Sequence, residues 1–266
     1  MPDLVAGGLS IHYAATPSVP RRPAVVLLHG AGANHTVWLG QMQALRERAW
    51  VVIPDLPGHG RSAPIEGLTI DEYAGALIPF LEEIHARLPE GPGPPPGLFL
   101  AGHSMGGAIT LAIALRRPDL LSGIALLGSG ARLGVSPKIF EGLEADPAGT
   151  QRMIAQWSFA EGTAAEMIDR TVRDLAGTPA ARLLADFRAC NAFDVRERLA
   201  EVRTPALVLC GSEDRMTPPK SSAFLAERLP HAALEIIERA GHSAMIESAQ
   251  VVSSALARFI GAVPAA

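Results

Sequence analysis

The sequence predicts an α/β fold in which helices cover both faces of a mainly parallel sheet. Short apolar runs, typical of strands buried on both sides, alternate with longer segments of helical periodicity along most of the chain. Such alternation is the pattern of parallel strands joined by crossover helices. The 266 residues, 48% of them hydrophobic, are enough for one large domain with a substantial core.

The first half of the chain supplies most of the expected strands. Residues 9–13 alternate apolar and polar side chains, which predicts an edge strand. Buried strands are expected over residues 24–28, 50–53, 98–101 and 123–127, and helices over residues 38–48, 70–88 and 106–117. Proline and glycine dominate residues 89–97, which predicts a stiff surface connection between a helix and a strand and no domain boundary.

The strand pattern stops near residue 130 and resumes near residue 204. Residues 131–203 contain short amphipathic stretches separated by proline and glycine, so we expect a helical cap inserted into a core made of residues 1–130 and 204–266. One or two apolar side chains of this cap should line a substrate pocket; the candidates are Met153, Ile154, Trp157, Phe159, Phe187 and Phe193. The remaining expected elements are strands 206–210 and 234–237, a helix over 222–229 and a last helix to about residue 260.

Charge and composition narrow the classes of partner. A net charge of −4 and a pI near 6.1 give no basic surface for nucleic acid or an anionic membrane, and they favour a small molecule as substrate. Cys190 and Cys210 are the only cysteines, which indicates neither a disulfide framework nor a zinc site. No metal or phosphate-binding motif occurs, so no cofactor is expected. The first residues lack a basic and an apolar signal region, which predicts a cytoplasmic protein.

The most informative motif is the pentapeptide Gly102-His103-Ser104-Met105-Gly106. It lies between an expected buried strand and an expected helix, where a G-x-S-x-G sequence predicts a nucleophile elbow with the serine hydroxyl exposed on a strained turn. Taken alone, the pentapeptide also permits a glycine-rich turn without chemistry or a membrane-helix dimerisation face, although His103 and Ser104 interrupt the apolar run.

Polar residues after the later strands provide a separate test. In open parallel sheets the ligand site lies beyond the carboxyl ends of the strands. A serine nucleophile needs a base, and the base needs an orienting acid. His242 and Asp214 follow the last two expected strands and fit these roles. His231 is set aside as the base because it precedes the strand at 234–237 and falls at the opposite edge of the sheet. Asp214 is preferred to Glu213 as the acid because the shorter Asp side chain is the one that more commonly orients a catalytic histidine.

The chain order Ser104, Asp214, His242 resembles that of the α/β-hydrolase superfamily. The likeness covers nearly the whole chain; the motifs that carry it are His29-Gly30, Asp55-Leu56-Pro57-Gly58-His59-Gly60-Arg61-Ser62, the pentapeptide at Ser104, Gly211-Ser212-Glu213-Asp214 and Gly241-His242. This resemblance implies an α/β-hydrolase fold with a mostly parallel eight-stranded sheet, helices on both faces and a helical cap.

The resemblance also implies roles for individual residues. The backbone N–H groups of Ala31 and Met105 would form an oxyanion hole. His29, His59 and His103 precede Ser104 in motifs that the superfamily uses structurally, and Glu247 is expected to be structural as well. None of these side chains is expected to act as the base.

The predicted reaction is hydrolysis of a carboxylic ester of a small, largely apolar substrate through an acyl-enzyme. Alternatives on the same triad are carbon-carbon bond hydrolysis, enol-lactone hydrolysis and cofactor-free perhydrolysis. Carbon-carbon hydrolases typically carry Asn before the serine and Trp after the histidine, where this chain has His103 and Ser243. A hydrolase-fold receptor with little turnover is a further alternative, disfavoured by the complete triad. The sequence leaves the oligomeric state open.

Overall fold

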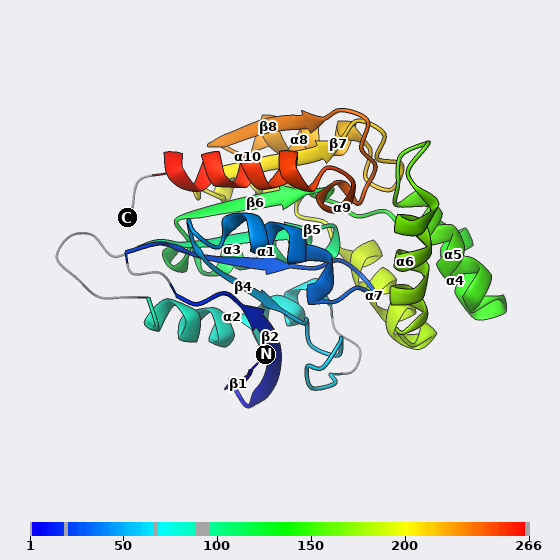
Figure 1. The fold of residues 1–266 in the computed structure, drawn as a ribbon, viewed down its shortest axis with the longest axis horizontal. Coiled ribbons are helices and arrows are strands. Elements are labelled where there is room, and N and C mark those ends of the chain that lie inside the picture. Colours follow the sequence, from blue (N-terminus) through cyan, green and yellow to red (C-terminus); the bar gives the residue numbers. More distant parts are fainter. Residues whose placement is uncertain (1, 19–20, 66–68, 89–95, 264–266) are drawn as a thin grey trace.

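The computed structural model describes residues 2–18, 21–65, 69–88 and 96–263 (Figure 1). Within these ranges, eight strands form one sheet in the order β1-β2-β4-β3-β5-β6-β7-β8. Their bounds are β1 Asp3–Ala6, β2 Leu9–Ala15, β3 Ala24–Leu28, β4 Trp50–Pro54, β5 Leu98–His103, β6 Gly123–Leu127, β7 Ala206–Gly211 and β8 Ala232–Ile237. Only β2 runs against the others, because it pairs antiparallel with both of its neighbours. The expected mostly parallel eight-stranded sheet is confirmed.

The edge position expected for the strand at residues 9–13 is wrong. β2 covers those residues and lies second in the sheet, because β1 pairs with it on the outside. Gly7 and Gly8 form the connecting turn, with φ of 57° and 81°, values that glycine adopts without strain. Leu4 is buried and Val5 is 69% exposed. Alternation over four residues is too short a signal to predict this strand from the sequence.

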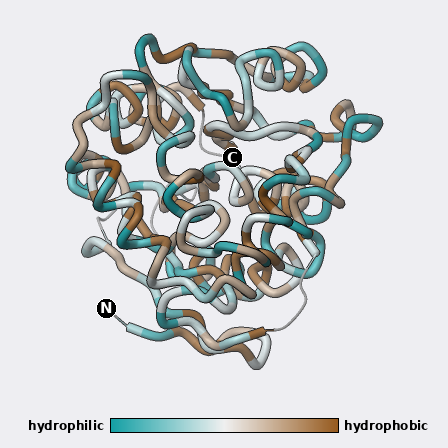
Figure 2. The backbone as a smooth tube through the Cα atoms, turned by 90° about the vertical axis from the view of Figure 1, so that its right-hand side faces the viewer, coloured by the Kyte–Doolittle hydropathy of each residue, from teal (hydrophilic) through white to brown (hydrophobic). Residues whose placement is uncertain are grey.

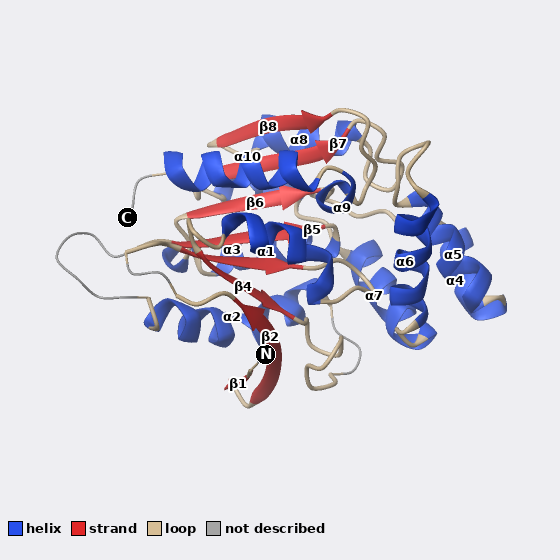
Figure 3. Ribbon diagram, in the orientation of Figure 1, coloured by secondary structure: helices blue, strands red, loops and turns tan. Residues whose placement is uncertain are grey.

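Helices cover both faces of the sheet (Figure 3). α2 (Ile70–Ala86), α3 (Met105–Arg116) and α8 (Pro219–Arg228) share one core cluster with alternate strand residues such as Val26. α1 (Leu39–Leu45) and α10 (Ala249–Ala262) share a second cluster with the intervening residues, such as Val25. Each central strand is therefore buried on both sides, which explains its continuous apolar run.

Three expected helix boundaries differ in detail. The segment expected at 38–48 consists of a 3-10 turn, η1 (His35–Trp38), followed by α1, and the last helix is divided into α9 (Ala244–Glu247) and α10. α8 starts at Pro219, a residue well suited to the first helical position. Another 3-10 turn, η2 (Pro118–Leu120), follows α3. Of the connection expected at 89–97, residues 89–95 lie outside the described residues.

The segment between β6 and β7 is helical. It contains α4 (Pro137–Ala145), α5 (Pro147–Trp157), α6 (Ala165–Ala176), α7 (Ala180–Ala192) and the 3-10 turn η3 (Arg196–Glu201). These α-helices bury an apolar cluster of their own, which includes Ile154, Leu183 and Phe187. They lie at the carboxyl ends of the parallel strands (Figure 1). Viewed from that side, hydrophobic and hydrophilic stretches alternate along the tube (Figure 2), as amphipathic helices require.

Across the described ranges, the chain has no helix with the length and apolar character needed to cross a bilayer.

Candidate active site

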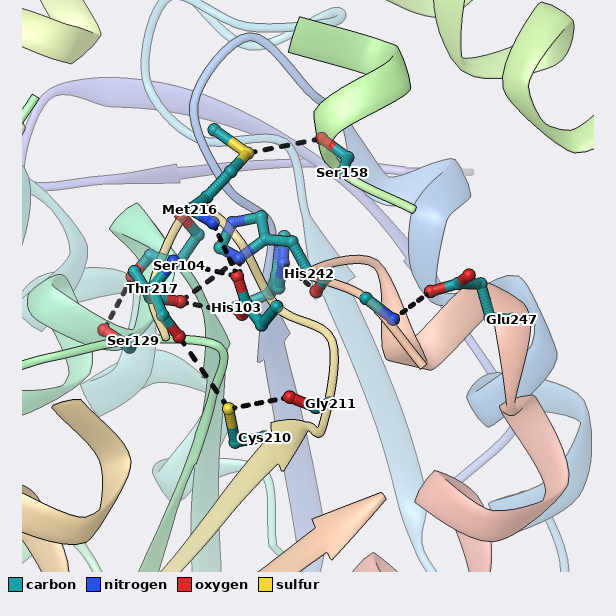
Figure 4. Close-up of polar contacts among 12 residues, drawn as sticks. His103, Ser104, Ser129, Ser158, Cys210, Gly211, Met216, Thr217, His242 and Glu247 are labelled. Atoms are coloured by element: carbon teal, nitrogen blue, oxygen red, sulfur yellow. Dashed lines mark hydrogen bonds and ion pairs between the residues drawn. The ribbon is translucent and has the colours of Figure 1, made fainter. Parts of the chain in front are cut away.

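Ser104 occupies a strained turn between β5 and α3. Its φ of 53° and ψ of −116° place it in the left-handed half of backbone space, which costs a non-glycine residue about 1–3 kcal/mol. Among the described residues only Arg21 and Arg239 share a positive φ without being glycine. The turn is held on both sides, because Ser104 N–H donates to the Leu127 carbonyl at 2.9 Å. The Ser129 hydroxyl donates to the Ser104 carbonyl, also at 2.9 Å (Figure 4).

The flanking glycines allow the close approach that this turn needs. A Cβ atom on Gly102 would lie 2.1 Å from the carbonyl oxygen of Gly106, and one on Gly106 would lie 2.5 Å from the carbonyl oxygen of Leu28. Both obstacles are backbone atoms, which cannot rotate away as a side chain can. The spacing of glycines around Ser104 is therefore a packing requirement of the strand, turn and helix.

Gly102→Ala is expected to lower the free energy of unfolding by roughly 3 kcal/mol, because the added methyl group must displace backbone in a packed core. Urea denaturation followed by circular dichroism measures the change. Gly261→Ala in α10 is the matched control, since its added Cβ meets no atom within 4 Å and a helical glycine-to-alanine change is stabilising by up to about 1 kcal/mol. Equal stability of Gly102→Ala and wild type would contradict the packing role.

His242 and Asp214 form a buried hydrogen-bonded pair beyond the ends of β8 and β7. The Nδ1–H of His242 donates to Asp214 Oδ2 at 2.9 Å. The other carboxylate oxygen, Oδ1, accepts the backbone N–H groups of Met216 at 2.9 Å and Thr217 at 2.8 Å, and the Thr217 hydroxyl donates to Oδ2 at 2.8 Å. Since Nδ1 carries the proton, Nε2 of His242 is the nitrogen that can accept one.

Burial of Asp214 alone would raise its pKa. The charge of His242 and the hydrogen bonds from His242 and Thr217 outweigh this effect and hold the pKa of Asp214 below its ordinary value. The carboxylate is therefore ionised at neutral pH and can orient the imidazole and stabilise its cationic form.

Ser104 and His242 line the same cavity, of about 80 Å³. Their side chains lie close together beyond the strand ends, with Thr217 beside them (Figure 4). In the described part of the chain, the Ser104 hydroxyl has no hydrogen-bond partner, so it is open to a ligand in the cavity. Hydrogen bonds within catalytic groups are often long before substrate binds.

Two backbone N–H groups near Ser104 have no acceptor among the described residues. One belongs to Ala31, which lines the cavity, and the other to Met105, the first residue of α3. The first N–H groups of a helix lack intrahelical partners, and the helix dipole adds partial positive charge at the same point. The two residues expected to form an oxyanion hole thus offer free donors beside the nucleophile candidate.

His29 and His103 are buried and neutral. Burial, with the nearby charge of His59, lowers the pKa of His29 to about 3, and burial, with the nearby charge of His242, lowers that of His103 to about 3. The Nδ1–H of His29 donates to the Gly30 carbonyl at 2.9 Å, and the Nε2–H of His103 donates to the His242 carbonyl at 3.0 Å. Both rings therefore support backbone of the site.

Among the described residues, the acids and the histidine set aside from the sequence make no hydrogen bond to the side chains of His242 and Asp214. His231 is exposed at the start of β8, the opposite end from His242. Glu213 accepts a hydrogen bond from the N–H of Glu161 at 3.1 Å. Glu247 accepts the N–H of Gly241 at 2.6 Å and thereby holds the loop that carries His242. Within the described ranges, His, Cys, Asp and Glu side chains form no group of three or more that could hold a metal ion.

Sequence reasoning missed Thr217, Ser129 and Asp186. The backbone N–H and the hydroxyl of Thr217 both donate to the carboxylate of Asp214. The Asp itself is the local signal of this turn, because Asp side chains often accept backbone N–H groups a few residues further along the chain. For Ser129, the one feature of the sequence that could have indicated a place in the site is its position after β6. Asp186 has none, because it is a single acid within the helical pattern of α7.

Asp186 joins α7 to the loop that carries Ala31. It is fully buried and accepts hydrogen bonds from the N–H of Gly32 at 2.9 Å, the Tyr73 hydroxyl at 2.9 Å and His59 Nε2 at 2.7 Å. The carbonyl of Gly32 accepts the hydroxyl of Thr178 at 2.8 Å. The helical segment therefore holds both backbone groups of the residue after Ala31.

Comparisons with known proteins agree with this geometry. The family model for the alpha/beta hydrolase family matches residues 25–255. A pimeloyl-[acyl-carrier protein] methyl ester esterase of Aeromonas hydrophila is 31% identical over 255 residues, which cover 90% of this chain and 96% of that protein. A 3-oxoadipate enol-lactonase 2 of Acinetobacter baylyi is 26% identical and covers 95% of this chain and 94% of its own length.

Among solved structures, a thermophilic esterase superposes with a TM-score of 0.86 at 28% identity and covers 100% of this chain and 98% of its own. The fold and the strand-end position of the polar residues agree with this family match, which covers residues 25–255. The chain therefore belongs to the α/β-hydrolase family.

Proposed function

We propose that the protein is a serine hydrolase that cleaves carboxylic esters of small, largely apolar substrates through an acyl-enzyme. The observation that carries this proposal is the strained Ser104, whose hydroxyl is open to a ligand. Ser104 lines the same cavity as His242, and Asp214 accepts a hydrogen bond from Nδ1 of that histidine. The esterase relatives support the same chemistry. The chain is an α/β-fold ester hydrolase in this assignment.

Each step follows from the positions of these groups. Nε2 of His242 takes the proton of Ser104 while Oγ attacks the ester carbonyl carbon, and the N–H groups of Ala31 and Met105 hold the oxyanion, each worth roughly 3–4 kcal/mol in the transition state. The alcohol leaves with the proton from His242. Water, activated by the same nitrogen, then attacks the acyl-enzyme and releases the acid, while Asp214 orients the imidazole in both halves.

Residues 131–203 act as a cap on a core of residues 1–130 and 204–266 in this proposal. Ile154, Leu175 and Phe187 of this segment line the cavity at Ser104, which supports an apolar substrate of limited size. The two cysteines are free and buried, which supports a cytoplasmic setting.

Active-site labelling tests the proposal directly. A fluorophosphonate probe should modify the wild-type protein at Ser104, identified by mass spectrometry of the peptide, and p-nitrophenyl esters of increasing acyl length should be hydrolysed with a preference for short chains. A protein that neither labels nor hydrolyses any ester is not a serine hydrolase. An enol-lactone substrate belongs in the same series because one relative is an enol-lactonase, and selective turnover of that ring ester would change the subtype.

A further inference from the structure

A second, larger pocket also reaches Ser104. It has a volume of about 570 Å³ and lies between the segment after β6 and the loop after β7. Ser104, Phe187 and Met216 line both this pocket and the smaller cavity. If Ser104 attacks the carbonyl of an ester, the part of the substrate on one side of that carbonyl can therefore lie in the smaller cavity and the part on the other side in the larger pocket.

The charges around the larger pocket have one sign. Arg132, Arg215 and Lys220 line it, and no Asp or Glu is among its described lining residues. All three cations are exposed at the pocket. In the described part of the chain, none of their side chains makes a hydrogen bond or an ion pair within 4.0 Å, whereas many other arginines of the surface do.

Asp194, the backbone bridge partner of Arg132, does not neutralise the cations of the pocket. Asp194 forms an isolated backbone bridge with Arg132, but its carboxylate binds Arg196 through hydrogen bonds at 2.6 Å and 2.9 Å. Those bonds, and to a smaller degree the charge of Arg132, lower the pKa of Asp194 to about 2. Asp214, which precedes Arg215 in the chain, has its oxygens occupied by His242, Met216 and Thr217.

We propose that this cationic pocket, lined by Arg132, Arg215 and Lys220, binds a carboxylate on the substrate, so that the preferred esters are monoesters of dicarboxylic acids. The uncharged end, with the ester alcohol, lies toward the small cavity, and the acyl chain with its terminal carboxylate lies along Phe187 into the cationic pocket. Three cations with free donors can bind a carboxylate. The formal net charge of −4 does not cancel this attraction at short range, because salt screens charges that lie further away. This inference rests on the proposed ester hydrolysis at Ser104.

Substrates of equal length and different charge test it. Monomethyl adipate should be hydrolysed with a kcat/KM about 10- to 100-fold above that of methyl hexanoate, the gain expected from hydrogen bonds to a charged group, and methyl 6-aminohexanoate should be the poorest of the three. Raising the ionic strength should reduce kcat/KM for the anionic ester alone, because salt screens exposed charges.

Single Arg132→Gln, Arg215→Gln and Lys220→Gln variants should each lower kcat/KM for monomethyl adipate more than kcat/KM for methyl hexanoate, and so reduce the preference for the anionic ester. Arg152→Gln and Lys138→Gln are the matched controls, because both are exposed cations of the segment between β6 and β7, which also carries Arg132, and they line neither pocket. Equal kcat/KM for anionic and neutral esters, or an equal loss for both substrates in the variants, would overturn the inference.

Binding separates this inference from the proposed function. The Ser104→Ala protein, titrated calorimetrically with monomethyl adipate and with neutral dimethyl adipate, should bind the anionic ester about tenfold or more tightly. If no ester is turned over by wild type but this difference in affinity is present and is lost in Arg215→Gln, the hydrolase assignment fails and the anion site stands. If esters are hydrolysed without any difference in affinity, the anion site alone fails.

Discussion

Ser104→Ala is expected to lower kcat for ester hydrolysis by about 10⁶-fold, the loss seen when the nucleophile of a serine hydrolase is removed. The reaction then loses its covalent route, while the N–H groups of Ala31 and Met105 stay in place and support a small residual rate. The serine hydroxyl makes no hydrogen bond among the described residues, so its removal should leave the free energy of unfolding nearly unchanged. Burst and steady-state kinetics with p-nitrophenyl acetate, and urea denaturation, measure the two quantities.

Ser243→Ala is the matched control for this substitution. Ser243 lines the same cavity and follows His242 directly, but it has no role in the proposed mechanism, so its activity should stay within about tenfold of wild type. His242→Ala should lose about as much as Ser104→Ala, and the double variant should lose no more than either, because the two groups act as one unit. A Ser104→Ala protein that retained a percent or more of wild-type activity would show that another group attacks the ester.

The sheet and the strand-end residues were predictable because their signals are local. The segment at β3 is apolar without interruption since both faces of that strand are covered, and such a run can be recognised without knowledge of the fold. The positions of Asp214 and His242 follow from the same recognition, because each lies in the loop that follows a strand and parallel strands end at one edge. The glycines around Ser104 were predictable for the same reason, because they belong to a turn of only five residues.

Some of the missed features give too short a pattern in the sequence, and others depend on contacts between distant segments. β1 is a strand because Asp3–Ala6 pairs with β2, and four residues carry too little periodicity to show it. Ser129 forms its hydrogen bond with Ser104, 25 positions away. Asp186 accepts a hydrogen bond from Gly32, 154 positions away. A polar residue in an amphipathic helix is normally exposed, so the sequence gives no reason to place Asp186 in the interior.

Asp186→Ala is expected to lower the free energy of unfolding by about 3–5 kcal/mol, the cost of removing one partner from a buried charged network. The substitution leaves the Gly32 N–H, the Tyr73 hydroxyl and His59 Nε2 without an acceptor in a fully buried place. Burial, together with the charge of Asp186, raises the pKa of Tyr73, so this hydroxyl stays protonated and needs an acceptor. Chemical denaturation of both proteins measures the difference.

Two further variants divide the effect of Asp186 into parts. Tyr73→Phe removes one of the three donors and should lower the free energy of unfolding by about 1 kcal/mol. Asp169 is an exposed acid of α6 without a hydrogen-bond partner among the described residues. Asp169→Ala should therefore change the free energy of unfolding by less than about 0.5 kcal/mol. A cost for Asp186→Ala no larger than that of Asp169→Ala would show that the network contributes little.

The activity of Asp186 variants tests whether the network also positions the Ala31 N–H, the proposed oxyanion donor. If Asp186 holds Gly32 and thereby Ala31, Asp186→Asn, which keeps the shape and an acceptor oxygen, should retain more of kcat than Asp186→Ala at a temperature where both proteins are folded. KM should change less than kcat, because a displaced Ala31 N–H weakens the transition state more than the bound ester. Equal kcat in Asp186→Ala and wild type would limit Asp186 to holding the helical segment against the sheet.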